Sequence, residues 1–472
     1  AAGTQYYTQA DVFPTMAFWS SRLTSVVFPS SIKVVGGRIF FGSDSLKSVT
    51  FTGDVDSICA SAFYGCPQLS EVTLQGVHYI GDQAFSGTAI STLTLPDGLD
   101  SLGNAVFYGC GNLRELHMPN SVVKMGESTF QYCDSLTSVT LSAGLTEIPA
   151  QTFRYCTQLR DLTLPNGIKR IGDIAFMDCP ATPLLPDGLV EIGRSAFSYY
   201  GKPTVELPSS LRTIGRGAFE WSELTSIVIP EGVDSVEDGT DFASNGAFED
   251  CEYLRRAVIP STLRRIASYM FDGCERLTDV IIAEGVEEIG DGAFKGCVAL
   301  ETLDLPASLR RMDDQSLAEC SALSAIALPE GLTAIGEEAF KDDESLATAT
   351  LPSTLTEVGR GAFMGCSALT SLRVDAMTPP TAYVNSFIDV DVEACTLYVP
   401  NGAVDAYRAA PYWQDFLRIT DERPVGIGNV TVGPDPNVVG RYGIDGRPVV
   451  EGERGFQILR MSDGTWRKVM VK

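Results

Sequence analysis

Cysteines are the most regular of the potentially reactive side chains in this 472-residue chain, which contains 12 of them. A zinc site needs four ligands that converge on one point at about 2.3 Å, and a disulfide needs two facing Cβ atoms. One cysteine in each unit of a repeat gives a row of parallel side chains, which satisfies neither requirement. We therefore expect buried free thiols at the repeated position, with no evident partner for Cys59 and Cys395. The repeated cysteines are Cys66, Cys110, Cys133, Cys156, Cys179, Cys251, Cys274, Cys297, Cys320 and Cys366.

Few other side chains in the sequence could carry chemistry. There are 2 histidines, and His117 has no acidic neighbour except Glu115, so no Ser/His/Asp or Cys/His set can be assembled. The formal net charge of −25 argues against a nucleic-acid partner, because phosphate binding needs clustered Lys and Arg. We predict no enzymatic activity, no bound metal and no cofactor.

The sequence also lacks membrane and targeting signals. No apolar run approaches the roughly 18 residues that a membrane-spanning helix needs. The first residues, AAGTQYYTQADVFP, have neither the basic start nor the apolar stretch of a signal peptide. We expect no transmembrane segment, and we expect that a signal peptide has been removed.

The elements that position the cysteines come from an internal repeat with the consensus L-x-x-L-x-L-P-x-x-L-x-x-I-G-x-x-A-F-x-x-C. Alternating leucines, such as Leu162 and Leu164, predict a short strand. The A-F-x-x-C stretch predicts about one turn of α or 3₁₀ helix, and Gly172 and its equivalents are expected to supply a turn conformation. One residue in each unit, mostly 23 residues apart, anchors the alignment: Phe18, Phe40, Phe63, Phe85, Phe107, Phe130, Phe153, Phe176, Phe197, Phe219, Phe248, Phe271, Phe294, Leu317, Phe340 and Phe363.

A single unit cannot bury its apolar face, so neighbouring units must stack into a solenoid. The pattern, over about residues 18–374, resembles the leucine-rich repeats of BspA-like surface proteins, also called the Treponema-type class. The resemblance implies an α/β fold: a right-handed solenoid with a parallel concave sheet and short 3₁₀ or α turns on the convex side. We assign about sixteen 23-residue coils to residues 1–374.

Two further segments follow the repeats. Residues 391–418 resemble the closing cap of such arrays, and we assign the cap to residues 375–421. Residues 440–472 are similar to the C-terminal sorting domains of Bacteroidetes surface proteins, on Tyr442, the Asp445-Gly446-Arg447 turn, Gly455-Phe456-Gln457-Ile458 and Lys468-Val469-Met470-Val471-Lys472. The tail is shorter than a full sorting domain. We expect a small β unit over residues 422–472.

Polar residues between the core leucines are expected on the concave sheet. Threonine and serine there simply suit an exposed strand, or the residues form a shallow groove, acidic in its first half, that binds a protein or a glycan. The charged candidates are Glu71, Glu115, Asp161, Glu206, Arg256, Asp279, Asp304 and Arg373.

The repeat departs from its consensus between about residues 176 and 248, and aromatic residues appear near there two positions after the anchor, where most coils have glycine. These rings either fill space around shortened turns or form a recognition patch. The inserted loop 237–246 carries Glu237, Asp238 and Asp241, which could bind Ca²⁺ but lack the ligand spacing of a calcium loop. The aromatic candidates are Tyr132, Tyr155, Tyr199, Tyr200 and Trp221.

The resemblance implies a non-enzymatic, secreted or cell-surface protein that adheres to a host or bacterial surface protein. Two alternatives remain open at this point: a glycan-binding module that uses the Tyr/Trp patch, and a structural spacer. We expect a monomer, and the sequence names no ligand.

Overall fold

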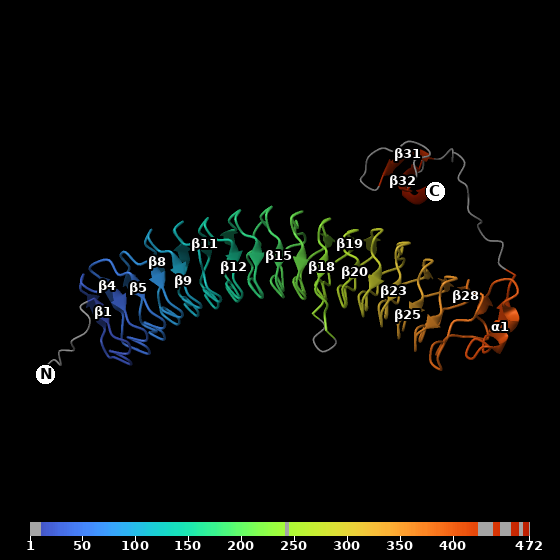
Figure 1. Ribbon diagram of the computed structural model, residues 1–472, viewed down its shortest axis with the longest axis horizontal. Coiled ribbons are helices and arrows are strands. Elements are labelled where there is room, and N and C mark those ends of the chain that lie inside the picture. Colours follow the sequence, from blue (N-terminus) through green and yellow to red (C-terminus); the bar gives the residue numbers. More distant parts are fainter. Residues whose placement is uncertain (1–10, 241–244, 423–437, 444–454, 462–465, 472) are drawn as a thin grey trace. The chain divides into compact units, whose positions relative to one another are not determined.

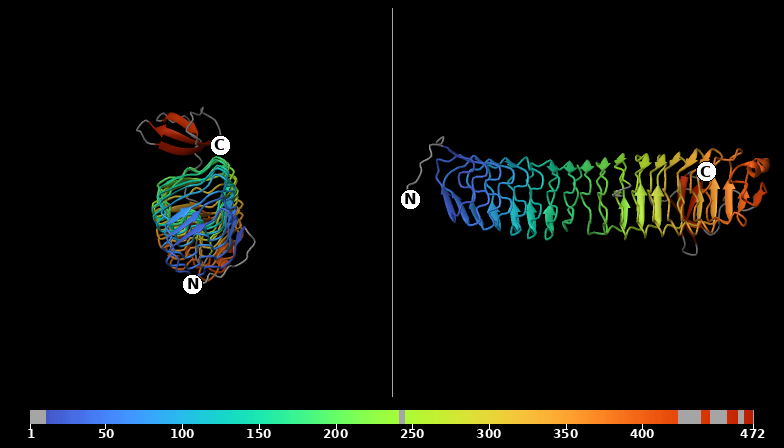
Figure 2. Two further views of the ribbon diagram at one scale, coloured as in Figure 1. Left: turned by 90° about the vertical axis from the view of Figure 1, so that its left-hand side faces the viewer. Right: turned by 90° about the horizontal axis from the view of Figure 1, so that it is seen from below.

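The computed structural model describes residues 11–240, 245–422, 438–443, 455–461 and 466–471. The chain divides into two compact units, residues 1–421 and 422–472. The first unit is an elongated, gently curved solenoid whose coils follow one another in sequence order (Figure 1). Seen nearly end-on, its coils overlap in one outline (Figure 2). The predicted solenoid of parallel strands is therefore confirmed.

Each coil contributes to one or both of two rows of short parallel strands, where the sequence predicted a single sheet. The first strand row contains the expected L-x-L strands. It comprises β2 (Ser25–Phe28), β4 (Ser48–Phe51), β6 (Glu71–Thr73), β8 (Thr92–Thr94), β10 (Glu115–His117), β11 (Ser138–Thr140), β13 (Asp161–Thr163), β17 (Ser226–Val228), β19 (Arg256–Ile259), β21 (Asp279–Ile282), β24 (Ala325–Ala327), β26 (Thr348–Leu351), β28 (Ser371–Val374), β29 (Thr396–Tyr398) and β30 (Arg418–Thr420).

The second strand row is made by the x-I pair that precedes the consensus glycine. Its inward residue is buried in nearly every coil, whereas the outward residue is partly or fully exposed. It comprises β1 (Val12–Phe13), β3 (Val34–Val35), β5 (Ser57–Ile58), β7 (Tyr79–Ile80), β9 (Ser101–Leu102), β12 (Glu147–Ile148), β14 (Arg170–Ile171), β15 (Glu191–Ile192), β16 (Thr213–Ile214), β18 (Ser235–Val236), β20 (Arg265–Ile266), β22 (Glu288–Ile289), β23 (Arg311–Met312), β25 (Ala334–Ile335) and β27 (Glu357–Val358).

The A-F-x-x-C stretch forms turns, and not the α or 3₁₀ helix that the sequence suggested; α1 (Val404–Ala409) is the only helix within the described residues. The residues two before and two after the anchor have positive φ, as at Ser61 (56°) and Gly65 (66°), and left-handed residues interrupt a regular helix. Their N–H groups instead donate to the next coil: Ser61 to the Asp82 carbonyl at 2.7 Å and Gly65 to the Ser86 carbonyl at 2.9 Å. We call the surface formed by these turns the turn face.

The anchor phenylalanines stack through the interior from Phe18 to Phe294 and again from Phe340 onward. Successive ring centroids lie between 5.1 Å, for Phe176 and Phe197, and 6.1 Å, for Phe85 and Phe107. Burying each ring stabilises the fold by roughly 1.5–3 kcal/mol, and Leu317 takes the ring's place in one coil. The stack extends one coil beyond the predicted sixteen, because Phe387 stacks on Phe363 at 5.9 Å.

The cysteines form a second internal row, and all 12 are free thiols. Nine of them donate a hydrogen bond to the anchor carbonyl of the preceding coil, from Cys156 to Phe130 at 3.0 Å up to Cys297 to Phe271 at 3.3 Å. Ser43 makes the same bond to Phe18 at 3.2 Å. The repeated cysteine is therefore a small buried donor that satisfies a backbone carbonyl.

The consensus glycine has a different role from the predicted one. Gly172 is not in a positive-φ conformation. A Cβ atom at this position would lie 2.5 Å from the backbone nitrogen of Ala150 in the preceding coil. The glycine is required because adjacent backbones approach too closely for a side chain, and the same conflict arises at Gly126 and Gly215.

The strand pattern is interrupted where the sequence departs from its consensus. Within the described residues the first strand row has no strand between β13 and β17, and Leu184 in this gap is 85% exposed. The phenylalanine stack nevertheless continues through Phe176, Phe197 and Phe219. The phenylalanine stack and the second strand row, in which β14, β15, β16 and β18 pair in succession, therefore keep these coils in register.

The array ends in aromatic residues that cover its last coils. Tyr407 of α1 and Trp413 are fully buried. The Tyr407 hydroxyl donates to the Ala376 carbonyl at 2.8 Å, and the Trp413 indole donates to the Pro380 carbonyl at 2.7 Å. The second unit contains a three-stranded antiparallel sheet of β31 (Val438–Gly443), β32 (Gly455–Met461) and β33 (Trp466–Val471).

Thiol titration of the non-reduced protein tests the cysteine row. We expect all 12 thiols to react after unfolding. We expect native protein to react slowly, because burial raises the pKa of thiols such as Cys66 and Cys110 to about 11 and so lowers their thiolate fraction. Partly exposed Cys59 is expected to react first. Fewer than 12 thiols in the unfolded, non-reduced protein would reveal disulfides and contradict this structure.

Asp343 occupies the cysteine position of its coil and should make stability depend on pH. Its Oδ1 accepts the Cys320 N–H at 2.7 Å, whereas its Oδ2 is buried without a hydrogen-bond partner. Burial raises the pKa of Asp343 well above its ordinary value. The folded state therefore keeps a proton that the unfolded state loses above about pH 4, so this residue lowers stability as pH rises.

We expect Asp343→Cys to stabilise the protein at pH 7 by about 1–3 kcal/mol, the cost of a buried polar atom without a partner. The gain should shrink toward pH 4, where Asp343 becomes protonated in both states. Urea unfolding of both proteins at the two pH values measures this difference, and a gain that is equal at both values would argue against titration of Asp343.

Candidate functional site

The turn face carries the aromatic candidates in exposed positions. Tyr132, Tyr199 and Trp221 are 37%, 49% and 48% exposed, and Tyr155 is partly exposed. Each lies two residues after its anchor at positive φ, between 56° and 64°. Their N–H groups donate to the next coil, as Tyr199 does to Glu220 at 2.9 Å and Trp221 to Glu249 at 3.0 Å.

These rings stack along the array. Tyr132 and Tyr155 are stacked with centroids 5.0 Å apart, and Tyr199 and Trp221 with centroids 6.4 Å apart. Tyr108 packs edge-on against Tyr132 at 5.4 Å and is 38% exposed. We call Tyr108, Tyr132, Tyr155, Tyr199 and Trp221 the aromatic row.

Sequence reasoning missed Tyr108, because it lies one residue after its anchor and not two. The same is true of Trp19, Phe41 and Tyr64, which stack in series at 5.3 and 4.8 Å on the first coils. Aromatic residues directly after the anchor were a signal that could have identified them.

Tyr200 does not belong to this surface, contrary to the sequence-based expectation. It is only 7% exposed and packs edge-on against Phe197 at 5.9 Å and Phe219 at 6.0 Å. It lies three residues after its anchor, where other coils place cysteine. Tyr200 is therefore a core residue of a coil that lacks the cysteine.

Backbone conformation makes the exposed rings costly to place. A residue with a Cβ atom in the left-handed region loses about 1 kcal/mol relative to glycine, and neighbouring coils have Gly87 and Gly109 at the same position. Stacking of exposed rings returns a comparable amount. Stability alone therefore gives little reason for aromatic residues at these positions.

The environment of Tyr199 and Trp221 is acidic. Asp178 precedes them at the equivalent position of one coil, and Asp250 follows at that of another. Glu220 lies between the two rings in sequence and is 7% exposed. Burial and the nearby Asp178 and Glu220 carboxylates raise the pKa of Tyr199.

The charged candidates of the first strand row are dispersed. Glu71, Glu115 and Asp161 are exposed, but Thr92 and Ser138 separate them in the register. Glu206 is exposed in a coil that contributes no strand to the first strand row, and Asp304 is exposed after a single bridge residue. Two arginines are engaged within the chain: Arg256 pairs with Asp279, and Arg373 with Asp375 at 2.9 Å. The structure does not gather these residues into one site.

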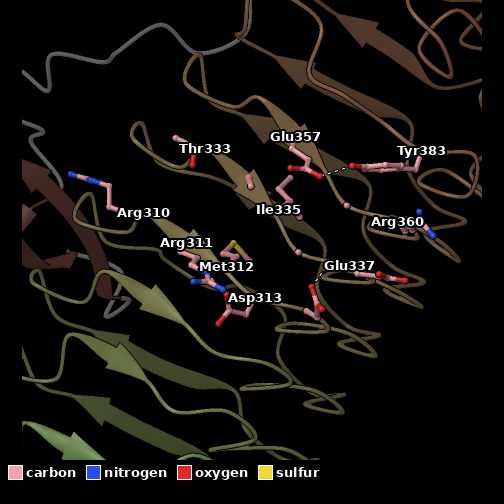
Figure 3. Close-up of a pocket in the computed structure, with 14 residues that line it drawn as sticks. Arg310, Arg311, Met312, Asp313, Thr333, Ile335, Glu337, Glu357, Arg360 and Tyr383 are labelled. Atoms are coloured by element: carbon pink, nitrogen blue, oxygen red, sulfur yellow. Dashed lines mark hydrogen bonds and ion pairs between the residues drawn. The ribbon is translucent and has the colours of Figure 1, made fainter.

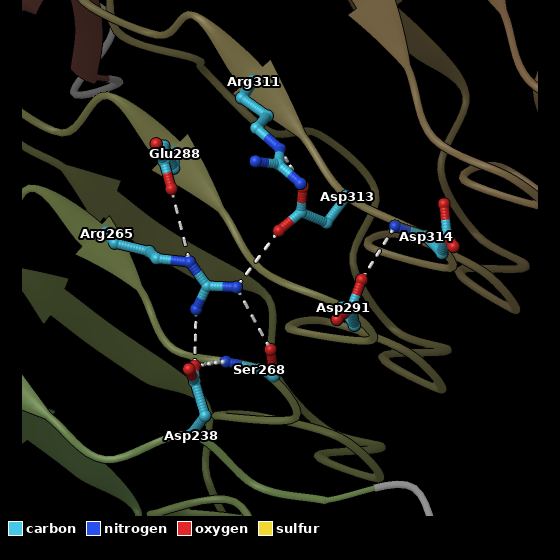
Figure 4. Close-up of polar contacts among 8 residues, drawn as sticks. All are labelled: Asp238, Arg265, Ser268, Glu288, Asp291, Arg311, Asp313 and Asp314. Atoms are coloured by element: carbon cyan, nitrogen blue, oxygen red, sulfur yellow. Dashed lines mark hydrogen bonds and ion pairs between the residues drawn. The ribbon is translucent and has the colours of Figure 1, made fainter.

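The second strand row carries a dense ionic network that sequence reasoning missed (Figure 4). Asp313 takes the consensus glycine position and its side chain is 8% exposed. Arg265 contacts it at 3.0 Å, contacts Glu288 at 3.4 Å and also pairs with Asp238. Arg311 pairs with the other Asp313 oxygen. The network neutralises a carboxylate that replaces glycine, so its role is structural.

A shallow hollow of about 410 Å³ lies over β23, β25 and β27 (Figure 3). The hollow forms at Ala334, whose small side chain lies between the longer side chains of Arg311 and Glu357. Glu357 accepts a hydrogen bond from the Tyr383 hydroxyl at 2.6 Å, and Arg360 lies over the Tyr383 ring at 5.4 Å. These polar groups already contact one another, and their geometry assigns no reaction.

The other chemical hypotheses find little support. Glu237 pairs with Arg194 and Asp238 with Arg265, so these carboxylates are not available to Ca²⁺, and Asp241 lies outside the described residues. Across the part of the chain that the structure describes, no group of three or more His, Cys, Asp or Glu is arranged to hold a metal ion.

No described helix has the length and hydropathy to cross a membrane.

The repeat itself identifies the family. Residues 11–85, 78–184, 182–243 and 241–370 match the BspA type leucine rich repeat region, in six copies. The chain belongs to this family. No curated protein sequence gives a significant match.

Solved structures of several leucine-rich repeat proteins are similar to this chain. A leucine-rich repeat protein from Bacteroides ovatus is 24% identical, with a TM-score of 0.61 over 79% of this chain and 91% of that one. A Treponema pallidum leucine rich repeat protein is 28% identical over 36% of this chain and 80% of its own, with a TM-score of 0.33. A leucine rich cell surface protein from Faecalibacterium prausnitzii is 23% identical over 79% and 85%, with a TM-score of 0.34.

Paired substitutions of adjacent arginines test the ionic network. We expect Arg265→Ala to lower the free energy of unfolding by about 1–3 kcal/mol, because it removes a partner of the nearly buried Asp313. Arg264→Ala should cost less than about 0.5 kcal/mol, since Arg264 is 79% exposed and contacts Glu287 at 3.4 Å. Urea unfolding followed by circular dichroism measures both, and equal losses would remove the structural role assigned to the network.

Proposed function

We propose that this chain is a non-enzymatic binding protein, secreted or attached to the cell surface, that holds a protein partner through the aromatic row. Membership of the BspA-type family supports a binding role in general. The observation that carries the specific proposal is the exposure of stacked rings at left-handed positions, where glycine would be the less strained choice. The C-terminal β unit, residues 422–472, would serve export or attachment, as its resemblance to sorting domains implies.

The rigidity of the scaffold suits this role. The rings project from turns whose N–H groups are bonded to the next coil, and the coils are fixed by the phenylalanine stack. A partner would therefore meet aromatic surface that is already ordered, and little conformational entropy would be lost on binding. Large rigid aromatic side chains are enriched in binding hot spots for this reason.

A glycan is the second candidate. The rings of Tyr108, Tyr132 and Tyr155 continue over three successive coils, with centroids 5.4 and 5.0 Å apart. An extended line of rings suits an extended chain better than a compact protein epitope. A spacer without a ligand of its own would need none of these exposed rings.

Replacement of Tyr199 and Trp221 by glycine tests the proposal. Glycine suits the left-handed backbone, so the double variant should fold, with a change in stability of less than about 1 kcal/mol. We expect binding to purified extracellular-matrix or plasma proteins, measured by surface plasmon resonance, to weaken at least about tenfold, as the loss of a hot spot does.

The matched control is Tyr79→Ser. Tyr79 is 42% exposed but lies on the second strand row, where its neighbours in register are Ser57 and Ser101. It should bind as the wild-type protein does. Unchanged affinity of the glycine double variant would contradict the proposal, and a hit confined to a glycan array and lost in that variant would favour the second candidate.

A further inference from the structure

The pair formed by Tyr199 and Trp221 stands in a part of the turn face that has an excess of negative charge. Along successive coils the position two residues after the anchor is occupied by Asp178, Tyr199, Trp221 and Asp250. The two stacked rings therefore lie between two aspartates in the register of the coils, and the Asp250 Oδ1 atom extends toward Gly273 of the following coil. Glu220 adds a third carboxylate between them in sequence.

These carboxylates form no ion pair within the described residues. Glu220 is 7% exposed, and its hydrogen bonds come from neutral donors: Ser195 at 3.1 Å, Ser198 at 2.7 Å and Asn245 at 2.9 Å. None of the ion pairs in the described part of the chain involves Asp178, Glu220 or Asp250.

The pKa shifts of Asp250 and Asp178 agree with an excess of carboxylates near the two rings. The pKa of Asp250 is raised by burial and by the nearby Glu252, Glu220 and Glu275 carboxylates. The Arg154 guanidinium lowers the pKa of Asp178 against the larger effect of its burial, which raises it. The carboxylates that neighbour the two rings along the array thus favour a positively charged ligand.

Other rings of this protein already hold a cation from the same chain. The Arg154 guanidinium lies 4.9 Å from the Tyr155 ring centroid, Arg276 lies 5.3 Å from that of Tyr253, and Arg360 lies 5.4 Å from that of Tyr383. Over Tyr199 and Trp221 the described part of the chain places no arginine or lysine at such a distance. These two rings thus combine a face for cation–π contact with nearby carboxylates that form no ion pair.

We propose that the Tyr199–Trp221 pair binds a lysine or arginine side chain of a basic polypeptide segment. The ring faces would contact the cation, and the Asp178 and Asp250 carboxylates, one coil to either side of the pair, would add electrostatic attraction. The inference rests on the proposed function, that a protein partner binds this face, and adds the chemistry of that partner. A neutral glycan would donate hydroxyl hydrogen bonds to the carboxylates but would lack the charge that they attract, and an anionic glycan would be repelled.

Labelled peptides of eight lysines, eight arginines and eight glutamates are the probes, with binding followed by fluorescence polarisation at low and physiological salt. We expect the two basic peptides to bind the full chain, more weakly as salt screens the charges, and the glutamate peptide not to bind. The double variant Asp178→Asn/Asp250→Asn should weaken binding at least about tenfold, and Trp221→Gly should do the same. Asparagine and glycine both tolerate the left-handed backbone, so these variants keep the fold.

The control is Glu71→Gln/Glu115→Gln, which removes the same amount of charge from the exposed first strand row. It should change affinity less than about twofold. An equal loss in this control would show that the peptides respond to the net charge of −25 and not to this site. Absence of binding by either basic peptide to the wild-type chain would also overturn the inference.

Once a protein that binds the turn face is found, its binding to the two double variants distinguishes failure of this inference from failure of the proposed function. If Tyr199→Gly/Trp221→Gly abolishes its binding while Asp178→Asn/Asp250→Asn leaves it unchanged, the proposed function stands and the cationic ligand is refuted. If neither variant affects its binding, both are refuted. Loss of binding in both variants supports both.

Discussion

The contact between one coil and the next governs this structure. Each coil lies one strand spacing from the next and must offer it the same three features. These are an aromatic ring, a hydrogen-bond donor for the anchor carbonyl, and a glycine where the two backbones approach closely. The ring centroids remain between 5.1 and 6.1 Å through the array. Because these requirements repeat from coil to coil, the sequence repeats.

Departures from the repeat show how each requirement can be met differently. Tyr200 fills the place of a cysteine with an edge-on ring. Asp313 fills the place of a glycine and brings two arginines with it. Asp343 fills the place of a cysteine and leaves one oxygen without a partner. A substitution at the interface between coils thus has either a local compensation or a measurable cost, and the neighbouring coils remain in register.

Outward positions are free of these requirements, and function is expected there. The residue two after the anchor must adopt a left-handed backbone and bond to the next coil, but its side chain faces solvent. Glycine meets this need in many coils, whereas Tyr132, Tyr155, Tyr199 and Trp221 meet it at a cost. Packing between coils does not require aromatic side chains at these outward positions. The aromatic row is therefore better explained by function than by stability.

The sequence by itself determined the solenoid fold, the phenylalanine anchor of each coil and the free state of the thiols. It could do so because stacking of each coil on the next requires the same residues at a fixed interval along the chain. Only the tertiary structure decided the second strand row, the close approach at Gly172 and the burial of Tyr200, since period and residue type do not say which backbone lies beside which. It also decided which aromatic residues are exposed and which carboxylates form no ion pair. Those properties depend on side-chain direction across three or more coils, such as Arg265 reaching from Asp238 to Asp313, and no single repeat records that.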